Sequence, residues 1–300
     1  RHTHHAIGML NAIAYNIVGE PIISYGIEHT DGVMSVPSSG LLAESDIWQF
    51  TPDLTYDNGL PIIFADNSQC TFKFDVFAAI FWMLSRYEEY QPFMPDEHGR
   101  FTAVESFLYR NNLLHNPVVD HWIILIRSKL QVMYPDLQLA EEKYGFVPTI
   151  DVDSPWSYLH KGLLRNTGGL LRDVLQCKFR AVRERLLVLF HIQPDPFFTF
   201  SHIDELHGNL QPLFFILTGS YVKYDKSVSP HKRAFRRFVA NFGRQHSVGL
   251  HPSYQASDNA ARFAAELTNF QKLIGRQCQT SRQHFLRIKL PDYYQQLEQL

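Results

Sequence analysis

The first half of the chain carries short hydrophobic runs broken by turns, followed by two amphipathic stretches. Turn signals such as "DNGLP" (57–61) separate the extended runs. Apolar residues at helical spacing then predict helices over 75–90 ("DVFAAIFWMLSRYEEY") and 116–134 ("NPVVDHWIILIRSKLQVMY"). This half therefore predicts a compact α/β module, which ends near residue 143 within the polar, turn-like stretch "PDLQLAEEKYG" (135–145).

After residue 143 the pattern becomes a regular alternation of buried strands and amphipathic helices. Four strands that alternate with helices predict a parallel sheet covered on both faces, either doubly wound or closed into a barrel. The predicted strands cover 146–150, 212–217, 247–250 and about 279–286, and the predicted helices cover 168–190, 231–245, 258–274 and the residues from 291 onward.

Polar residues stand at the carboxyl end of every predicted strand in this second half. Asp151 and Asp153 follow the first strand, "TGS" (218–220) follows the second and "HPSY" (251–254) the third, while "RQH" (282–284) belongs to the fourth. In parallel α/β folds, ligands and catalytic groups gather at this edge. Each motif alone is more often structural than catalytic, but their meeting at one edge predicts a site.

The spacing of the two aspartates suits a metal site. Residues i and i+2 of a strand share a face, so Asp151 and Asp153 can point into one pocket. Two carboxylates in one pocket repel each other unless a cation separates their roles. A divalent ion on one aspartate acidifies a coordinated water, and the other aspartate stays free to accept a proton. His251 adds an imidazole of the kind that Zn²⁺ favours.

Composition and charge indicate an ordinary soluble globular chain. Of 300 residues, 45% are hydrophobic, which is enough for a large core, and the net charge is −2. Because no long block of like charge occurs, neither a nucleic acid nor a membrane surface is indicated as a partner.

Cysteine usage and hydropathy bear on the compartment. The three cysteines, Cys70, Cys177 and Cys278, are widely spaced and odd in number, which predicts neither a disulfide framework nor a Cys-x-x-Cys metal site. No apolar run reaches the roughly 18 residues of a membrane span, and the start "RHTHHAIGML" lacks the features of a signal peptide. We therefore expect a reducing, cytoplasmic setting without a transmembrane segment.

Three motifs in sequence order resemble a known family. "TIDVD" (149–153), "GLHPSY" (249–254) and "SRQHFLR" (281–287) resemble the polysaccharide deacetylase family, carbohydrate esterase family 4, with its NodB-homology domain. The runs "RYEEY" (86–90) and "LLRNTGGLLRDVL" (163–175) are similar to a bacterial subgroup with an extra N-terminal domain of unassigned function. The resemblance implies an N-terminal α/β domain over 1–143 and a deacetylase-like β/α-barrel over 144–300. This chain has fewer predicted strand–helix units than the barrels of that family. We therefore expect the catalytic acid, which protonates the leaving group, to lie beyond residue 300.

The resemblance also implies roles for individual residues. It makes Asp151 the general base, oriented by Arg282, with Asp153 and His251 as metal ligands. Gln255 stands where the family has its second metal histidine, and His284 is the best replacement as a third ligand. Ser253, Tyr254 and Phe285 occupy positions expected to contact substrate. The implied cofactor is Zn²⁺, or Co²⁺ or Ni²⁺, and the implied reaction removes N- or O-acetyl groups from a polysaccharide or glycan precursor.

Two other functions fit parts of the sequence. A phosphatase of the haloacid-dehalogenase type also places D-x-D after its first strand and a Ser or Thr after its second, as Thr218 stands here. That function leaves "GLHPSY" and "SRQHF" without a role. Alternatively, the protein is a catalytically inactive carbohydrate-binding or scaffold protein. Gln255, which stands in place of a metal histidine, would be consistent with that function. Metal content distinguishes the three: a transition metal for a deacetylase, weakly held Mg²⁺ for a phosphatase, and none for a scaffold.

Overall fold

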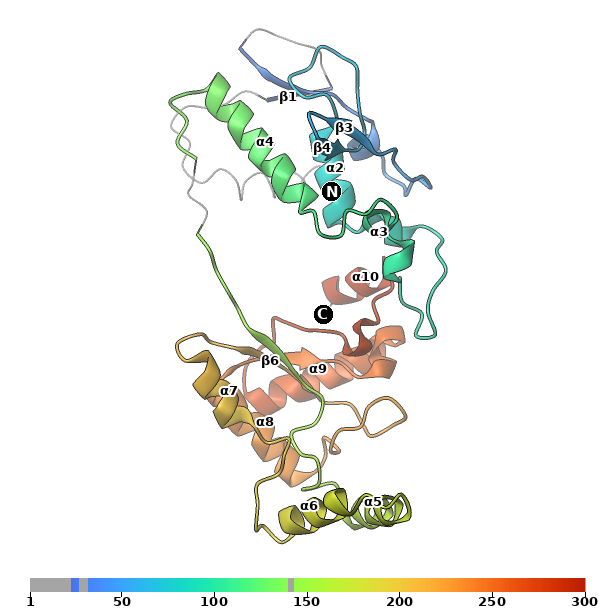
Figure 1. The fold of residues 1–300 in the computed structure, drawn as a ribbon, viewed down its shortest axis with the longest axis vertical. Coiled ribbons are helices and arrows are strands. Elements are labelled where there is room, and N and C mark those ends of the chain that lie inside the picture. The colour runs from blue at the N-terminus through green and yellow to red at the C-terminus, as the bar shows by residue number, and fades with distance from the viewer. Residues whose placement is uncertain (1–22, 27–31, 140–142, 300) are drawn as a thin grey trace. The chain divides into compact units, whose positions relative to one another are not determined.

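The chain forms two compact units, residues 1–143 and 144–300, in a computed structural model that describes residues 23–26, 32–139 and 143–299 (Figure 1). The division falls where the pattern of the sequence changes. The initial segment "RHTHHAIGML", which bears on the question of a signal peptide, lies outside the described residues. Each unit is mixed α/β and has its own core.

Unit 1 combines two small sheets with helices. The strand β1 (Ile23–Tyr25) pairs in parallel with β2 (Met34–Val36), and β3 (Thr55–Asp57) forms an antiparallel hairpin with β4 (Leu60–Ile62). Asn58 and Gly59 make the hairpin turn, and both have positive φ, as a tight Asn-Gly turn requires. The helices are α2 (Val76–Leu84), α3 (Phe107–Arg110) and α4 (Val118–Met133), with 3₁₀ helices η1 (Leu41–Ala43), η2 (Tyr87–Tyr90) and η3 (Ala103–Glu105).

The two helices predicted in unit 1 are present, and the first is shorter than predicted. Helix α2 begins after Asp75, whose carboxylate accepts a hydrogen bond from the Ala78 amide, and it ends at Leu84 because Arg86 adopts a left-handed conformation (φ 57°). The core of the unit surrounds Trp82 and Trp122, and the Trp122 indole donates to the Pro61 carbonyl at 2.8 Å. The described residues of this core all belong to unit 1.

Unit 2 is built on a parallel sheet of three strands in the order β5 (Thr149–Val152), β6 (Leu213–Leu217) and β7 (Ser247–His251). The chain continues beyond β7 with one parallel bridge between Leu250 and Ser281. Alternation gives the sheet two different faces. One face carries apolar side chains that belong to the hydrophobic core of the unit: Val152, Phe214, Ile216, Val248 and Leu250. The other face carries Asp151, Phe215 and Gly249, which the register places side by side across the strands, and His251, which stands opposite Leu217 at the end of β7.

The helices of unit 2 partly match the predicted pattern. Helices α8 (Arg233–Gln245), α9 (Ala260–Ile274) and α10 (Asp292–Glu298) occupy the predicted segments, with the 3₁₀ helix η4 (Tyr254–Asp258) before α9. The single long helix predicted over 168–190 is wrong. Two helices, α5 (Leu163–Leu175) and α6 (Phe179–Leu189), stand there, because Cys177 between them adopts a positive φ of 53°. Helix α7 (Phe200–His207) was not predicted.

Two predicted strands also differ from the structure. The first begins at Thr149 instead of Phe146, because its ladder with β6 stops where Pro148 stands beside Pro212, which has no N–H to donate. The strand predicted over about 279–286 is reduced to the bridge at Ser281. Phe285 and Leu286 have positive φ and form, with His284, the 3₁₀ helix η5 (His284–Leu286).

The described helices and the cysteines are consistent with two further expectations. Within the described ranges, no helix has both the length and the apolar character needed to cross a bilayer. Cys70, Cys177 and Cys278 form no disulfide with one another in the part of the chain that the structure describes.

Candidate metal centre

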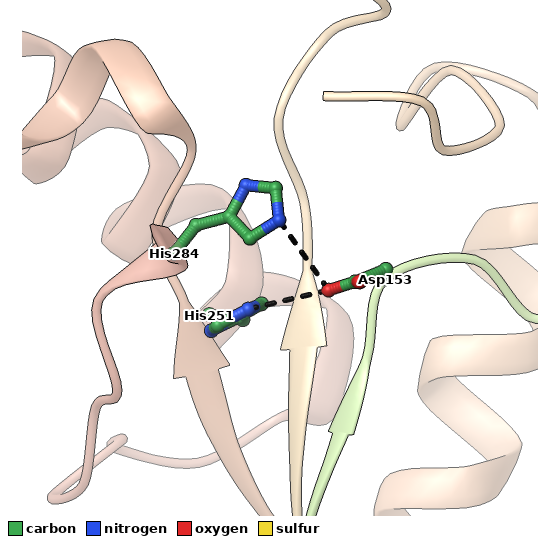
Figure 2. A group of neighbouring side chains, drawn as sticks. All are labelled: Asp153, His251 and His284. Atoms are coloured by element: carbon green, nitrogen blue, oxygen red, sulfur yellow. Dashed lines mark ion pairs between the residues drawn. The ribbon is translucent and has the colours of Figure 1, made fainter. Parts of the chain in front are cut away.

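Asp153, His251 and His284 meet at the carboxyl end of the parallel sheet (Figure 2). Asp153 follows strand β5, His251 ends β7, and His284 begins η5. The Asp153 Oδ1 atom lies 3.3 Å from His251 Nε2 and 3.5 Å from His284 Nε2. One ligand atom from each residue lies within 4.8 Å of the others. The three residues that the sequence indicated as metal ligands are thus brought together.

Hydrogen bonds fix which nitrogen of each imidazole faces this group. The Nδ1 atom of His251 lies 2.5 Å from the Arg282 carbonyl oxygen, which can only accept, so Nδ1 carries the proton. The Nδ1 atom of His284 lies 2.8 Å from the Asp225 carboxylate, which favours the same tautomer. In the neutral rings both Nε2 lone pairs therefore point toward Asp153. Such hydrogen-bonded partners are typical of histidines that bind metals.

The three side chains fit a divalent transition metal. Two lone pairs and a carboxylate oxygen that converge without a proton between them repel one another, and a cation removes that repulsion. A tetrahedral ion with bonds of about 2.1 Å holds its ligand atoms about 3.4 Å apart, close to the two separations from Asp153. Two imidazole nitrogens with one carboxylate suit Zn²⁺ and its neighbours better than Mg²⁺, which prefers oxygen ligands.

Burial and charge at the centre favour an ionised Asp153. His251 and His284 are buried, whereas the Asp153 side chain is 65% exposed and so leaves one side of the centre open. When the imidazoles also carry a proton on Nε2, hydrogen bonding from His251 lowers the pKa of Asp153 below its ordinary value, the charge of His284 adds to this effect, and together they outweigh the opposing effect of burial. The carboxylate is therefore ready to coordinate at neutral pH.

Arg282 lies against the other aspartate. Its guanidinium donates to Asp151 Oδ1 at 3.0 Å and to Thr149 Oγ1 at 2.6 Å, and it lies 4.6 Å from the centre of the Phe215 ring. Gly249 makes room for that ring, because a Cβ at Gly249 would come within 2.7 Å of Phe215. Phe215 therefore packs closely on Gly249, and its ring contacts the Arg282 guanidinium that binds Asp151.

The residues expected to contact substrate have other partners in the structure. Ser253 is buried, and its hydroxyl and amide both donate to the Glu266 carboxylate, at 2.5 Å and 2.8 Å. Tyr254 stacks on Tyr224 at 4.2 Å between ring centres, and Phe285 packs edge-on against Tyr254 at 5.3 Å. Ser253 thus anchors the turn after β7, while Tyr254 and Phe285 form an aromatic group beside His284. Gln255 is exposed and does not belong to the group of three.

The turn that carries His251 depends on a close backbone approach. A Cβ on Gly219, just after β6, would lie only 2.4 Å from the Ser253 Cβ. Glu266 of α9 holds Ser253 from the other side, and burial raises the pKa of Glu266 even though both bonds from Ser253 act to lower it. Gly219 and Glu266 together determine where the chain leaves β7.

Sequence reasoning missed two contributors to the site. Asp225 is buried, and it accepts from the Tyr254 amide at 3.0 Å as well as from His284. Lys161 lines a hollow of about 510 Å³ together with Asp151, Asp153 and Lys226, and desolvation lowers the pKa of Lys161 to about 8. Neither stands at a fixed distance from a strand end, so no spacing pattern indicated them.

Comparison with known proteins covers unit 1 alone. Residues 6–135 match a family of unknown function, DUF7033. No curated protein and no solved structure matches the chain. The match ends before the metal centre, so the chemistry of unit 2 rests on its own residues.

Proposed function

We propose that the protein is a metal-dependent deacetylase that removes N- or O-acetyl groups from a polysaccharide or glycan precursor, and that unit 2 is part of a NodB-type β/α-barrel. The observation that carries this proposal is the joint presence of the Asp153–His251–His284 group and the Arg282–Asp151 pair at one end of a parallel sheet. The motifs "TIDVD", "GLHPSY" and "SRQHFLR" supply both sets of residues.

In the proposed mechanism, the two aspartates have separate tasks. Asp153, His251 and His284 hold a divalent cation, which when bound supplies Lewis-acid polarisation of the acyl group and acidifies water. Asp151 accepts the proton of the attacking water, the bond from the acyl carbon to the sugar nitrogen or oxygen breaks, and that atom takes up a proton as acetate leaves. Arg282 holds the Asp151 carboxylate in place through Oδ1, while Thr149 shares the same guanidinium. Lys161 and Phe197 line the hollow beside these carboxylates and offer a cation and an aromatic surface to a sugar.

A phosphatase is the second candidate, and one observation favours it. Lys161 and Lys226 line the same hollow as Asp151 and Asp153, where they could bind a phosphate ester. The two buried imidazoles weigh against it, because an Mg²⁺-dependent phosphatase has no need of them. A scaffold without catalysis would require that the group of three hold no metal.

The experiment measures metal content and acetate release together. Full-length protein is loaded with Zn²⁺, Co²⁺ or Ni²⁺, assayed by elemental analysis, and offered a panel of N- and O-acetylated oligosaccharides. We expect Asp151→Asn to keep its metal and to lose at least about 100-fold in acetate release, because the general base is gone. Asp153→Ala should lose both the metal and the activity, while the fold, followed by circular dichroism, is retained.

Asp292→Asn, whose side chain is exposed at the start of α10, is the matched control and should leave both readouts unchanged. If the loaded protein releases no more acetate than Asp151→Asn on every member of the panel, the proposal is wrong. Phosphate release from p-nitrophenyl phosphate with Mg²⁺ would then favour the phosphatase. Unchanged metal content in Asp153→Ala would reject the metal centre itself.

A further inference from the structure

The hairpin formed by α5 and α6 (163–189) buries several polar side chains and exposes several large apolar ones. On α5, Asp173 is only 4% exposed and Asn166 is also buried, whereas Leu164 is 87% and Leu175 75% exposed. Positions 164, 171 and 175 share one helix face, opposite 166 and 173. The "LLRNTGGLLRDVL" motif thus presents leucines to the outside.

The buried polar side chains explain why the helix has this orientation. Arg185 of α6 donates to Asp173 at 2.6 Å and to Asn166 at 3.3 Å, and it lies 4.7 Å from the centre of the Tyr158 ring. The Asn166 amide in turn donates to the Tyr158 carbonyl at 3.0 Å. These polar contacts join the two helices to each other and to the segment around Tyr158. The exposed leucines Leu164 and Leu175 take no part in these contacts.

Helix α6 also carries an exposed stripe with large apolar side chains. Phe179, Arg183, Leu186 and Phe190 stand at helical spacing along one exposed stripe, and Phe190 is 72% exposed. An arginine lies within an apolar stripe, and its aliphatic stem can lie along such a surface while the guanidinium reaches a polar layer. The hairpin lies at one end of unit 2, away from the sheet (Figure 1).

The charge of this segment differs from that of the whole chain. Residues 161–192 contain seven lysines and arginines but only two acids, a surplus of five positive charges, whereas the chain carries −2. Both acids have partners: Asp173 binds Arg185, and Glu184 accepts from the Tyr158 hydroxyl at 2.8 Å. The exposed cations are Arg172, Lys178, Arg180 and Arg183.

We propose that the α5–α6 hairpin binds the surface of an anionic lipid bilayer. Amphipathic helices with leucine and phenylalanine on one face and lysine and arginine beside it lie in the bilayer interface, with the apolar face among acyl chains and the cations at lipid phosphates. Both helices can lie parallel to the plane of the bilayer. A second copy of this chain suits the surface less well, because a symmetric contact would bring the four exposed cations close to their own copies.

The experiment is vesicle flotation of the full-length protein. We expect binding to vesicles of 30% phosphatidylglycerol in phosphatidylcholine, weak binding to phosphatidylcholine alone, and release in 1 M NaCl, where charges are screened within about 3 Å. Leu164→Gln with Leu175→Gln should weaken binding about tenfold or more, because the buried apolar area is lost. Arg172→Gln, Lys178→Gln and Arg180→Gln together should remove the preference for anionic lipid.

The matched control is Val132→Gln with Leu206→Gln, two side chains of comparable exposure on α4 and α7. These substitutions should leave flotation unchanged. Because all of the altered side chains are exposed, we expect thermal unfolding to change little. The proposal is overturned if the wild type does not float with anionic vesicles, or if the double leucine variant floats equally well. It is also overturned if sedimentation shows a dimer that this variant dissociates, because the face would then join two copies.

Discussion

At the scale of single residues, the two imidazoles of the metal centre are held by different kinds of acceptor. His251 donates to a backbone carbonyl, which substitution does not remove, whereas His284 donates to the side chain of Asp225. The strand-end rule located Asp153 and His251 from the sequence, because their positions follow from strands that buried apolar runs define. Asp225 lies in the loop after β6, where no periodicity relates its position to the site, and only the folded structure identifies it.

The Asp225 carboxylate should tune metal affinity through His284. We expect Asp225→Ala to weaken Zn²⁺ binding about 10- to 100-fold, because the imidazole loses the group that fixes its tautomer and orientation. Asp225→Asn keeps an acceptor oxygen and should lose less. Competition with a chromophoric chelator measures both constants.

Asp258→Asn provides the comparison, because Asp258 accepts from the side chain of Arg287 instead of a histidine of the site and lies on the exposed end of η4. Its Zn²⁺ affinity should equal that of the wild type. Equal affinities for Asp225→Ala and the wild type would show that His284 needs no such support.

At the scale of elements, the correctly predicted strands and helices are those whose apolar run or stripe is continuous. Strands β6 and β7 and helices α8 and α9 lie within two residues of their predicted bounds, because each buries a continuous run or stripe. The errors occur where one residue changes backbone direction. Cys177 divides the predicted long helix, and Phe285 and Leu286 replace the last strand with a 3₁₀ turn. Left-handed conformations at residues other than glycine leave little trace in a sequence.

The turn after β6 should not tolerate a larger residue. Gly219→Ala would place a methyl group against the Ser253 Cβ and push the turn that carries His251, so we expect about 1–3 kcal/mol lower unfolding free energy and weaker Zn²⁺ binding. Denaturant unfolding and chelator competition measure the two effects.

Gly168→Ala is the matched substitution, since a Cβ there meets nothing within 4 Å and the residue lies inside α5. It should instead stabilise the protein by about 0.5–1 kcal/mol. If the two variants behave alike, the close approach of Gly219 to Ser253 is not what positions the turn.

At the scale of the whole molecule, averages over the chain conceal what its parts do. The net charge of −2 gave no indication of a membrane surface, yet residues 161–192 carry a surplus of five positive charges. Composition did indicate enough hydrophobic residues for a large core, and the structure divides them into two cores, one in each unit. The alternation of strands and helices and the parallel sheet could be predicted from periodicity, whereas the outward-facing leucines of the α5–α6 hairpin could not, because an outward and an inward apolar stripe have the same spacing.

Unit 1 should fold without unit 2. Its core around Trp82 and Trp122 is closed by contacts within residues 1–143, so this fragment should be soluble, show cooperative thermal unfolding and release no acetate from the oligosaccharide panel. Circular dichroism and tryptophan fluorescence follow the transition. A fragment that gives an unfolded spectrum at low temperature would mean that its core depends on the rest of the chain.

Arg282 connects the two halves of the site by two different parts of one residue. Its carbonyl orients the metal ligand His251, and its guanidinium holds Asp151. Substitution of Arg282 exchanges the guanidinium while the carbonyl stays, so under the proposed function a single codon change would silence hydrolysis and leave the Asp153–His251–His284 group in place. On the same proposal, descendants of such a protein would bind the acetylated sugar without cleaving it, as a lectin does.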